Sequence, residues 1–287
     1  MIKYLFVLLS FSLSTQHSFS QTTDVSTETE LKILSWNIYM LPFIIFKKSD
    51  KKDRAKDIVT ELSQMDYDVI LFQEAFKKNT RRVLRKGLRE EYPYIYGPAN
   101  QKKLSFKTSS GLYTFSKRPL IYKDDIQFDA CSGHDCLARK GAMLLEGEKN
   151  GHLFQVISTH TNGGTIINNH QFHMIYDGLL LPYKKEGVPQ IIGGDLNCPK
   201  SNPKRYNEML SLLDAEDGPT IGLNYSNWEK TNIIDYLLLR RNNSNVEVIK
   251  REILNIGPDW TLEFQRPQRE AIGLSDHYPI EIILRLQ

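Results

Sequence analysis

The sequence lacks the marks of several protein classes. Its 287 residues carry a formal net charge of only +3, whereas a nucleic-acid-binding domain usually shows a strongly basic balance or stripe. No internal repeat or low-complexity tract occurs between Leu31 and Gln287, and no Gly/Ser-rich or Pro-rich stretch is long enough to separate two domains. Hydrophobic residues (40%) and charged residues (25%) have the proportions of an ordinary folded domain. The composition therefore excludes a repeat array and a disordered chain, and it predicts one domain over residues 31–287.

Long hydrophobic runs are also missing. The apolar run that follows Lys3 ends at Leu9 and gives way to small polar residues up to Ser20, so it is far shorter than the roughly 20 residues of a membrane-spanning helix. This pattern is typical of a cleavable signal peptide, with a membrane anchor as the alternative. We therefore expect residues 1–20 to direct secretion or export to the periplasm, and the polar, Thr-rich residues 21–30 to form a flexible lead-in.

Cysteine is scarce, with three residues in the chain. Cys131 and Cys136 are close enough in sequence to close a small loop in an oxidising compartment, but two free thiols fit the sequence equally well. Cys198 is left over. No Cys-x-x-Cys pair or matching histidine spacing accompanies these residues, which argues against a zinc site built from them.

Short runs rich in Ile, Leu, Val and aromatic residues recur along the chain and predict strands. They cover residues 31–38, 69–72, 111–115, 142–145, 153–159, 190–192, 233–239, 246–249 and 280–286. Helical spacing of apolar residues occurs in 54–65, 80–90 and 205–213. The strands outnumber the helices and do not alternate with them steadily, which favours two packed sheets over one parallel sheet. We expect an α/β fold, a four-layer α/β/β/α sandwich of two mixed sheets flanked by helices.

Polar side chains follow several of these strands, where loops present them at one rim of the sheets. They are Asn37, Glu74, His160, Asp195, Asn197, Asp235, Asp276 and His277. A single acidic residue at a strand end is usually a turn former, but carboxylates gathered at one rim are costly to desolvate unless cations or histidines neutralise them. Oxygen-rich ligation suits Mg²⁺ better than zinc, with Mn²⁺ and Co²⁺ left open. The two histidines would supply proton transfer near neutral pH.

In their order along the chain, these residues resemble the motifs of the endonuclease/exonuclease/phosphatase superfamily. The motifs are Trp36-Asn37, Gln73-Glu74, Gly194-Asp195-Leu196-Asn197, Ile234-Asp235-Tyr236 and Ser275-Asp276-His277-Tyr278-Pro279. Within the superfamily, segments 36–42, 111–119 and 135–141 resemble the neutral, bacterial-type sphingomyelinases. The resemblance covers most of residues 31–286 and implies a DNase I-like sandwich.

The resemblance also implies which residues hold the metal and the phosphate. Glu74 would be the principal Mg²⁺ ligand, with Asn37 and Asp276 near the metal or the phosphate. Asp195 would position the attacking water, and Asn197 would donate a hydrogen bond to a phosphoryl oxygen.

The same resemblance assigns proton transfer to the two histidines. His277, oriented by Asp235, would take the proton of the water, and His160 would stabilise the pentacovalent state or assist the departing ceramide alkoxide. Asp135 and Lys140 resemble an Asp and a Lys near the active site of the family and are secondary candidates. A surface salt bridge is the alternative for this pair.

The chain departs from the resemblance in the segment that would contact the membrane. Secreted bacterial sphingomyelinases resemble one another in an exposed aromatic hairpin before the Ser-Asp-His motif, and the corresponding stretch here has Trp260 and Phe264 without evident paired aromatics at its tip. The apolar run before Lys47 contains Phe43 and Phe46, and apolar residues backed by cations suit an interfacial contact. Core packing is an equal alternative for this run.

The resemblance predicts a secreted, Mg²⁺-dependent phospholipase C-type enzyme that hydrolyses sphingomyelin to ceramide and phosphocholine. Its partner would be a sphingomyelin-containing membrane surface, with no nucleic acid and no protein partner, and it would act as a monomer. A secreted nuclease or another phosphoesterase of the same fold is the alternative, although the near-neutral charge and residues 39–42 disfavour a nuclease. A binding protein on a degenerate fold is opposed by the filled catalytic positions.

Overall fold

The computed structural model describes residues 29–41, 50–102, 106–242, 246–265 and 268–287. The expected signal peptide at 1–20 and the lead-in up to residue 28 lie outside these ranges, as do Phe43 and Phe46. Within the described part of the chain, no helix is long and apolar enough to cross a membrane.

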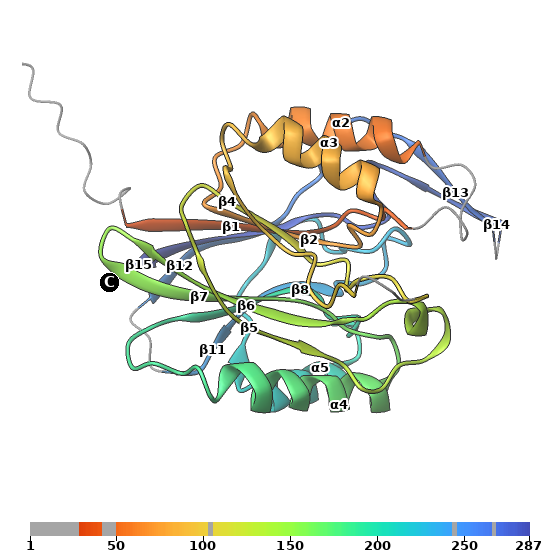
Figure 1. Cartoon of the computed structure of the whole chain (residues 1–287). Helices are drawn as coiled ribbons and strands as arrows, with labels where there is room; N and C mark the ends of the chain where they lie inside the picture. The colour runs from red at the N-terminus through yellow and green to blue at the C-terminus, as the bar shows by residue number, and fades with distance from the viewer. Residues whose placement is uncertain (1–28, 42–49, 103–105, 243–245, 266–267) are drawn as a thin grey trace, which may run out of the picture.

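Two mixed β-sheets pack face to face, and helices cover their outer faces (Figure 1). The first sheet has the order β10 (Ile221–Gly222), β12 (Val246–Ile253), β15 (Ile280–Leu286), β1 (Glu30–Asn37), β2 (Val69–Gln73), β4 (Tyr113–Ser116) and β3 (Tyr94–Tyr96). The second has the order β5 (Ile121–Gln127), β6 (Gly141–Lys149), β7 (His152–His160), β8 (Gln190–Asp195), β11 (Asp235–Arg240) and β9 (Ala215–Glu216). The predicted four-layer sandwich is confirmed.

The helices form the two outer layers. α2 (Lys51–Leu62) and α3 (Lys78–Leu88) lie above the first sheet in Figure 1, and α4 (Thr165–Ile175) and α5 (Pro203–Leu212) lie below the second. Two short helices, η1 (Gly133–Leu137) and η2 (Tyr176–Leu180), and a hairpin of β13 (Thr261–Gln265) and β14 (Gln268–Ile272) complete the described elements.

Alternation along the strands produces three layers of core between the four layers of the fold. Successive side chains of a strand point to opposite faces, so Ile33 of β1 joins the cluster between the sheets while Leu34 joins the cluster under α2 and α3. On the other side, Val156 of β7 lies between the sheets and Ile157 packs against α4 and α5. All four side chains are fully buried, which is why these strands read as continuous apolar runs.

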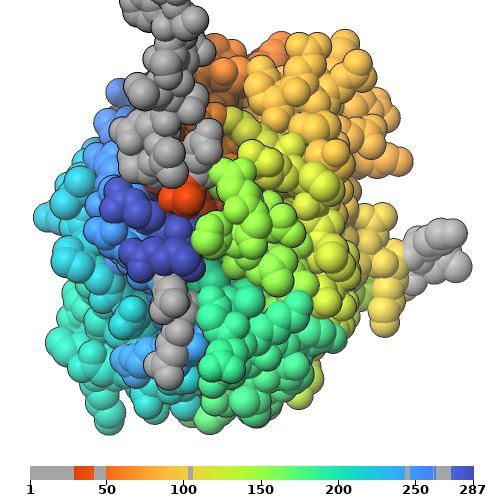
Figure 2. All heavy atoms as spheres, turned by 90° about the vertical axis from the view of Figure 1, so that its left-hand side faces the viewer, coloured from red at the N-terminus to blue at the C-terminus, as the bar shows by residue number. Residues whose placement is uncertain are grey.

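Strand direction brings the predicted polar residues to one rim of the sandwich. β1 and β2 are parallel and end side by side, with Asn37 opposite Gln73. β7 and β8 are also parallel and end with His160 opposite Asp195, and the antiparallel β11 begins with Asp235 opposite Asp195. Figure 2 shows the end of the molecule away from this rim, where the start of β1 lies beside the end of β15.

Several elements carry no clear sequence signal. α4 buries Asn168 and Gln171 beside its apolar residues, which obscures the helical spacing. β5 is an edge strand without a buried residue, and the hairpin of β13 and β14 occupies the stretch that departs from the family resemblance. The open question about the cysteines is resolved as well, because Cys131 and Cys136 form a disulfide around η1 and Cys198 is a buried thiol.

Candidate active site

The backbone at the rim turns sharply where the strands end. Glu74 and Asn197 adopt left-handed conformations, with φ of 56° and 47°, which cost energy for residues other than glycine and occur often at functional sites. At Gly194 the chain needs glycine, because φ is 154° and an added Cβ would lie 1.9 Å from the carbonyl oxygen of Thr159. The close pairing of β7 and β8 therefore fixes the position of the next residue, Asp195.

Asp195 is the hub of the site and is almost completely buried. Its Oδ1 accepts a hydrogen bond from the backbone N–H of Asn197 (3.0 Å), and its Oδ2 accepts one from Nδ2 of Asn37 (3.1 Å). The same Oδ2 lies 3.3 Å from Nε2 of His160 and 3.7 Å from Nε2 of His277. The structure thus brings together five residues from four separate strand ends of the sequence.

His277 forms a second close pair with Asp235. Its Nδ1 lies 2.8 Å from Oδ2 of Asp235, with both side chains at most 10% exposed. The hydroxyl of Ser226 is 3.0 Å from the backbone N–H of Asp235 and accepts its hydrogen bond. With Nδ1 donating to the carboxylate, Nε2 is left as the acceptor of the neutral ring, on the side that faces Asp195.

The charges of the cluster shift the pKa values of its members in opposite directions. Burial alone would lower the pKa of His277, but Asp235, Asp195 and Asp276 raise it well above its usual value. Burial raises the pKa of Asp195, but His277 and His160 lower it below the usual range of an aspartate. The neighbouring charges therefore favour the ionised form of Asp195 and the protonated form of His277.

Glu74 and Asp276 show the cost of gathering carboxylates. Burial raises the pKa of Glu74 to about 7, with Lys140 and His277 acting against it. Burial also raises the pKa of Asp276 to about 7, and the charge of Glu74 adds to this shift. Oε2 of Glu74 is buried and has no hydrogen-bond partner, although the residue as a whole is partly exposed. Such a carboxylate oxygen lacks the donor or cation that burial requires.

These donors fit a hard divalent cation. Asp195, Asp235 and His277 each offer an atom within 4.8 Å of the others, but Asp235 and His277 already bond to one another. Glu74 and Asp276 have carboxylates whose raised pKa values a cation would lower. Metal binding by Glu74, Asn37 and Asp276 therefore stays a prediction. The unpartnered oxygen of Glu74 favours these ligands over the group of Asp195, Asp235 and His277.

His160 lies against Lys140 on the other side of Asp195. Nζ of Lys140 is 2.8 Å from Nε2 of His160 and 2.8 Å from a carboxylate oxygen of Asp135. Burial and the ammonium group lower the pKa of His160, and Asp195 only partly offsets them. Lysine has only N–H donors, so this shorter contact makes Nε2 an acceptor and leaves the hydrogen on Nδ1, a buried atom without a partner. Lys140 is only 5% exposed, whereas Asp135 is 35% exposed, so a role of this pair in the site stays a prediction.

Of the residues predicted to contact a membrane, Trp260 and Phe264 lie in the described part of the chain, and Phe43 and Phe46 lie outside it. Trp260 is partly buried, packs against Tyr39 and Leu262, and donates from Nε1 to Oδ2 of Asp57 at 2.8 Å. Phe264 lies in the hairpin strand β13, opposite Arg269.

Arg54 supports the site but was missed by the sequence reading. Its fully buried guanidinium donates to the carbonyl oxygens of Ile38 (3.3 Å), Tyr39 (2.8 Å) and Leu274. It thereby ties the loop after β1 to the segment before Asp276. The signal in the sequence was an arginine next to Ala55 on the apolar face of a predicted helix.

Comparison with known proteins places these motifs in a family. The model of the endonuclease/exonuclease/phosphatase family matches residues 34–277. Among curated relatives, sphingomyelinase C of Leptospira interrogans is 29% identical over 87% of this chain, and phospholipase C of Staphylococcus aureus is 26% identical over 88% of it. The chain spans about half (51%) of the Leptospira protein and 87% of the Staphylococcus protein.

A similar fold occurs in solved structures. The crystal structure of a Staphylococcus aureus beta toxin mutant with bound magnesium ions matches with a TM-score of 0.76 at 24% identity, covering 90% of this chain and all of that one. The family resemblance and the fold predicted from the sequence are both confirmed by these comparisons.

Proposed function

Because the chain belongs to the endonuclease/exonuclease/phosphatase family, we propose that it is a phosphodiesterase that hydrolyses sphingomyelin to ceramide and phosphocholine. The observation that carries the proposal is the Asp235–His277 pair, whose free Nε2 faces Asp195. The relatives named sphingomyelinase C and phospholipase C support a lipid phosphodiester as the substrate class.

Attack begins with a water molecule held between Asp195 and His277. The carboxylate of Asp195 orients the water by accepting one of its protons in a hydrogen bond, and Nε2 of His277 takes the other proton as the oxygen attacks phosphorus. The Asp235 carboxylate stabilises the imidazolium that forms, through Nδ1 at 2.8 Å. A base of this kind contributes typically 10²–10⁴-fold to the rate.

The ceramide oxygen leaves on the opposite side of phosphorus from the attacking water. The new bond joins the water oxygen to phosphorus, and the bond that breaks joins phosphorus to the ceramide oxygen. The ammonium of Lys140, 2.8 Å from Nε2 of His160, gives this nitrogen a proton, which His160 passes to the departing alkoxide, so that Lys140 ends neutral. Asn197 donates from its amide to a phosphoryl oxygen as negative charge grows there.

A divalent cation, with Mg²⁺ as the first choice and Mn²⁺ or Co²⁺ as alternatives, would be held by Glu74, with Asn37 and Asp276 close by. When bound, it supplies Lewis-acid stabilisation of the charge on the phosphoryl group. The beta toxin structure with bound magnesium ions supports this choice. The positive charge of the cation would also lower the pKa of Glu74, which burial raises.

The remaining parts of the proposal concern where the enzyme works. Residues 1–20 would direct it out of the cell as a signal peptide. It would act as a monomer on a sphingomyelin-containing membrane surface, without a protein or nucleic-acid partner.

The test assays the purified protein on sphingomyelin, phosphatidylcholine and plasmid DNA, each with Mg²⁺ and with EDTA, beside His277→Ala. We expect release of phosphocholine from sphingomyelin that EDTA and the substitution both abolish. Cleavage of DNA with intact sphingomyelin would favour the nuclease alternative. Absence of metal-dependent turnover on all three would favour a binding protein.

A further inference from the structure

Large apolar side chains are unusually exposed beside the active site. Among the described residues, Phe106 and Ile166 are the most exposed large hydrophobic residues, at 110% and 87%, and Leu137 is 51% exposed. Single exposed apolar residues are ordinary on a protein surface. These three, however, lie in segments close in sequence or by hydrogen bonds to Lys140 and His160, with Leu137 at the end of η1 and Ile166 at the start of α4.

Phe106 and Leu137 lie on two segments that are bonded to each other. The N–H of Thr108 donates to the carbonyl oxygen of Leu137 at 2.9 Å, and the N–H of Arg139 donates to that of Thr108 at 3.2 Å. The second segment continues directly into Lys140, which contacts His160. The segments that carry Phe106 and Leu137 are therefore joined directly before Lys140 of the catalytic centre.

Ile166 lies on the helix that follows β7, the strand that ends at His160. It lies at the start of α4, six residues after His160. His170 follows one helical turn later on the same face, and its Nε2 is 2.7 Å from Oδ1 of Asp129. Gln171 also donates to the carbonyl oxygen of Ala130 at 2.9 Å. This end of α4 is thus held against the chain that leads into the disulfide loop.

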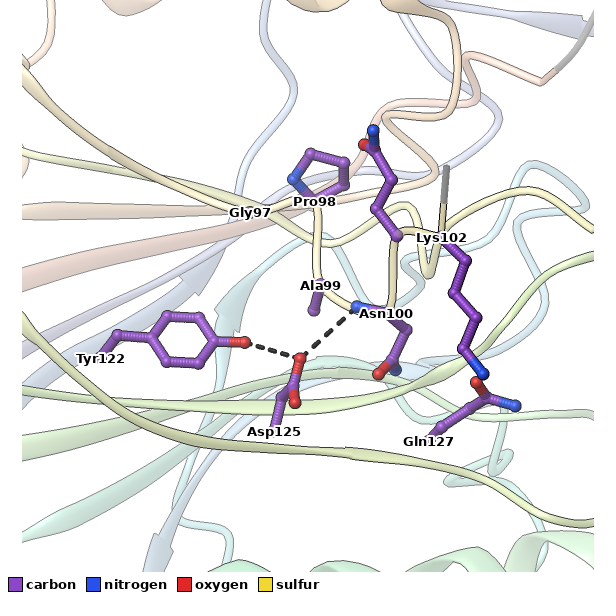
Figure 3. A pocket seen from close by; sticks show the side chains of 9 residues that line it. Gly97, Pro98, Ala99, Asn100, Lys102, Tyr122, Asp125 and Gln127 are labelled. Atoms are coloured by element: carbon purple, nitrogen blue, oxygen red, sulfur yellow. Dashed lines mark hydrogen bonds between the residues drawn. The ribbon is translucent and has the colours of Figure 1, made fainter. Parts of the chain in front are cut away.

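The loop that carries Phe106 is anchored at its base. A groove of about 450 Å³ separates residues 97–102 from β5 (Figure 3). At its centre, Oδ2 of Asp125 accepts hydrogen bonds from the hydroxyl of Tyr122 (2.7 Å) and the N–H of Asn100 (3.4 Å). In the close-up, Lys102 extends along the groove toward Gln127. The anchor holds the start of the loop against the second sheet.

The charges around these side chains suit a lipid headgroup layer. Lys102 and Lys107 are exposed on either side of Phe106. The two acids nearby are already engaged, Asp135 by Lys140 and Asp129 by His170. Apolar side chains that enter the acyl boundary and lysines that meet lipid phosphates are the composition of an interfacial contact.

We propose that Phe106, Leu137 and Ile166 form a docking surface that seats the rim on a lipid bilayer. The choice of a lipid bilayer as the binding partner of this surface rests on the proposed function, because a lipid substrate must reach His277 from a membrane. The surface is distinct from Phe43, Phe46, Trp260 and Phe264, which the sequence suggested. It draws on a segment before β4 of the first sheet and on segments before β6 and after β7 of the second sheet.

The test measures sedimentation with vesicles of phosphatidylcholine and phosphatidylglycerol, which contain no sphingomyelin, in EDTA. The variant is Phe106→Ser/Leu137→Ser/Ile166→Ser. The matched control is Leu153→Ser/Leu181→Ser, which changes exposed apolar residues at the start of β7 and after η2, away from the rim. Thermal unfolding checks that each variant folds. We expect the triple variant to bind at least about tenfold more weakly, because three apolar side chains no longer enter the bilayer, and the control to bind like the wild type.

A second readout separates this proposal from the proposed function. On bis(p-nitrophenyl) phosphate in solution the triple variant should turn over like the wild type, whereas on sphingomyelin vesicles its rate should fall by about the loss in binding. Wild-type binding by the triple variant overturns the docking surface even if sphingomyelin is hydrolysed. Loss of vesicle binding in a protein that leaves sphingomyelin intact supports the surface and rejects only the substrate.

Discussion

The indole Nε1 of Trp36 donates a hydrogen bond to the backbone carbonyl oxygen of His277 at 2.9 Å, across 241 positions of the chain. The hydroxyl of Ser275 in turn donates to the carbonyl oxygen of Asn37 at 2.6 Å. The first and last motifs of the sequence are therefore bonded to each other. Their side chains reach the catalytic centre because their backbones share these contacts.

Trp36→Phe should weaken both stability and catalysis. The ring still fills the core, but the carbonyl oxygen of His277 loses its partner, which costs roughly 1–3 kcal/mol in the free energy of unfolding. We expect kcat to fall because His277 is less well oriented. Urea unfolding and steady-state kinetics check this. Trp260→Phe is the control, since it loses a hydrogen bond to Asp57 away from His277 and should leave kcat unchanged.

Asp235→Asn should lower the pKa of His277. Asp235 is the largest of the charges that raise this pKa against the effect of burial, so its neutralisation removes stabilisation of the imidazolium. NMR titration of the imidazole C–H signals in the metal-free protein measures the shift directly. We expect kcat to fall as well, toward the roughly 10²–10⁴-fold loss of a removed base in His277→Ala. An unchanged titration of His277 would contradict the pairing.

Metal binding should release protons near pH 7. Glu74 and Asp276 have pKa values raised to about 7 in the metal-free protein, so each is partly protonated there and must ionise to bind a cation. Titration calorimetry with Mg²⁺ in two buffers of different ionisation enthalpy counts the protons. We expect the Kd to be at least about tenfold higher at about pH 5.5 than at pH 8. Identical heats in both buffers would count against these ligands.

The same shifts set how pH affects the metal-free fold. A carboxyl whose folded pKa lies above its unfolded value stabilises the protein fully at pH below the unfolded value, and this contribution disappears as the pH rises through the folded value. For Glu74 and Asp276 the loss spans roughly pH 4 to 7. Mg²⁺ should therefore raise the Tm more at pH 8 than at pH 5.5. Glu74→Gln, which removes one of these charges, should reduce that difference.

The layers and the rim were predictable because they depend on local patterns. Apolar runs such as residues 69–72 mark strands buried on both faces, and the acid, amide or imidazole groups after several of these runs mark one rim. The contacts that orient the site were not predictable in this way. Arg54, Ser226 and Ser275 act on backbone atoms up to 238 positions away, and no spacing in the sequence encodes such a pairing. The disulfide was not predictable either, because the sequence spacing of Cys131 and Cys136 fits a disulfide and two free thiols equally well.

Gly194→Ala should displace the backbone that positions Asp195 without changing any polar side chain. An added Cβ would lie 1.9 Å from the carbonyl oxygen of Thr159, and φ is 154°. β7 and β8 must then separate next to the pair of His160 and Asp195, so we expect a loss of roughly 2–5 kcal/mol in the free energy of unfolding. Gly163→Ala is the matched control, because a Cβ there meets no atom within 4 Å and should change stability by less than about 0.5 kcal/mol. Urea unfolding measures both, and equal stabilities would show that the strands do not require glycine beside Asp195.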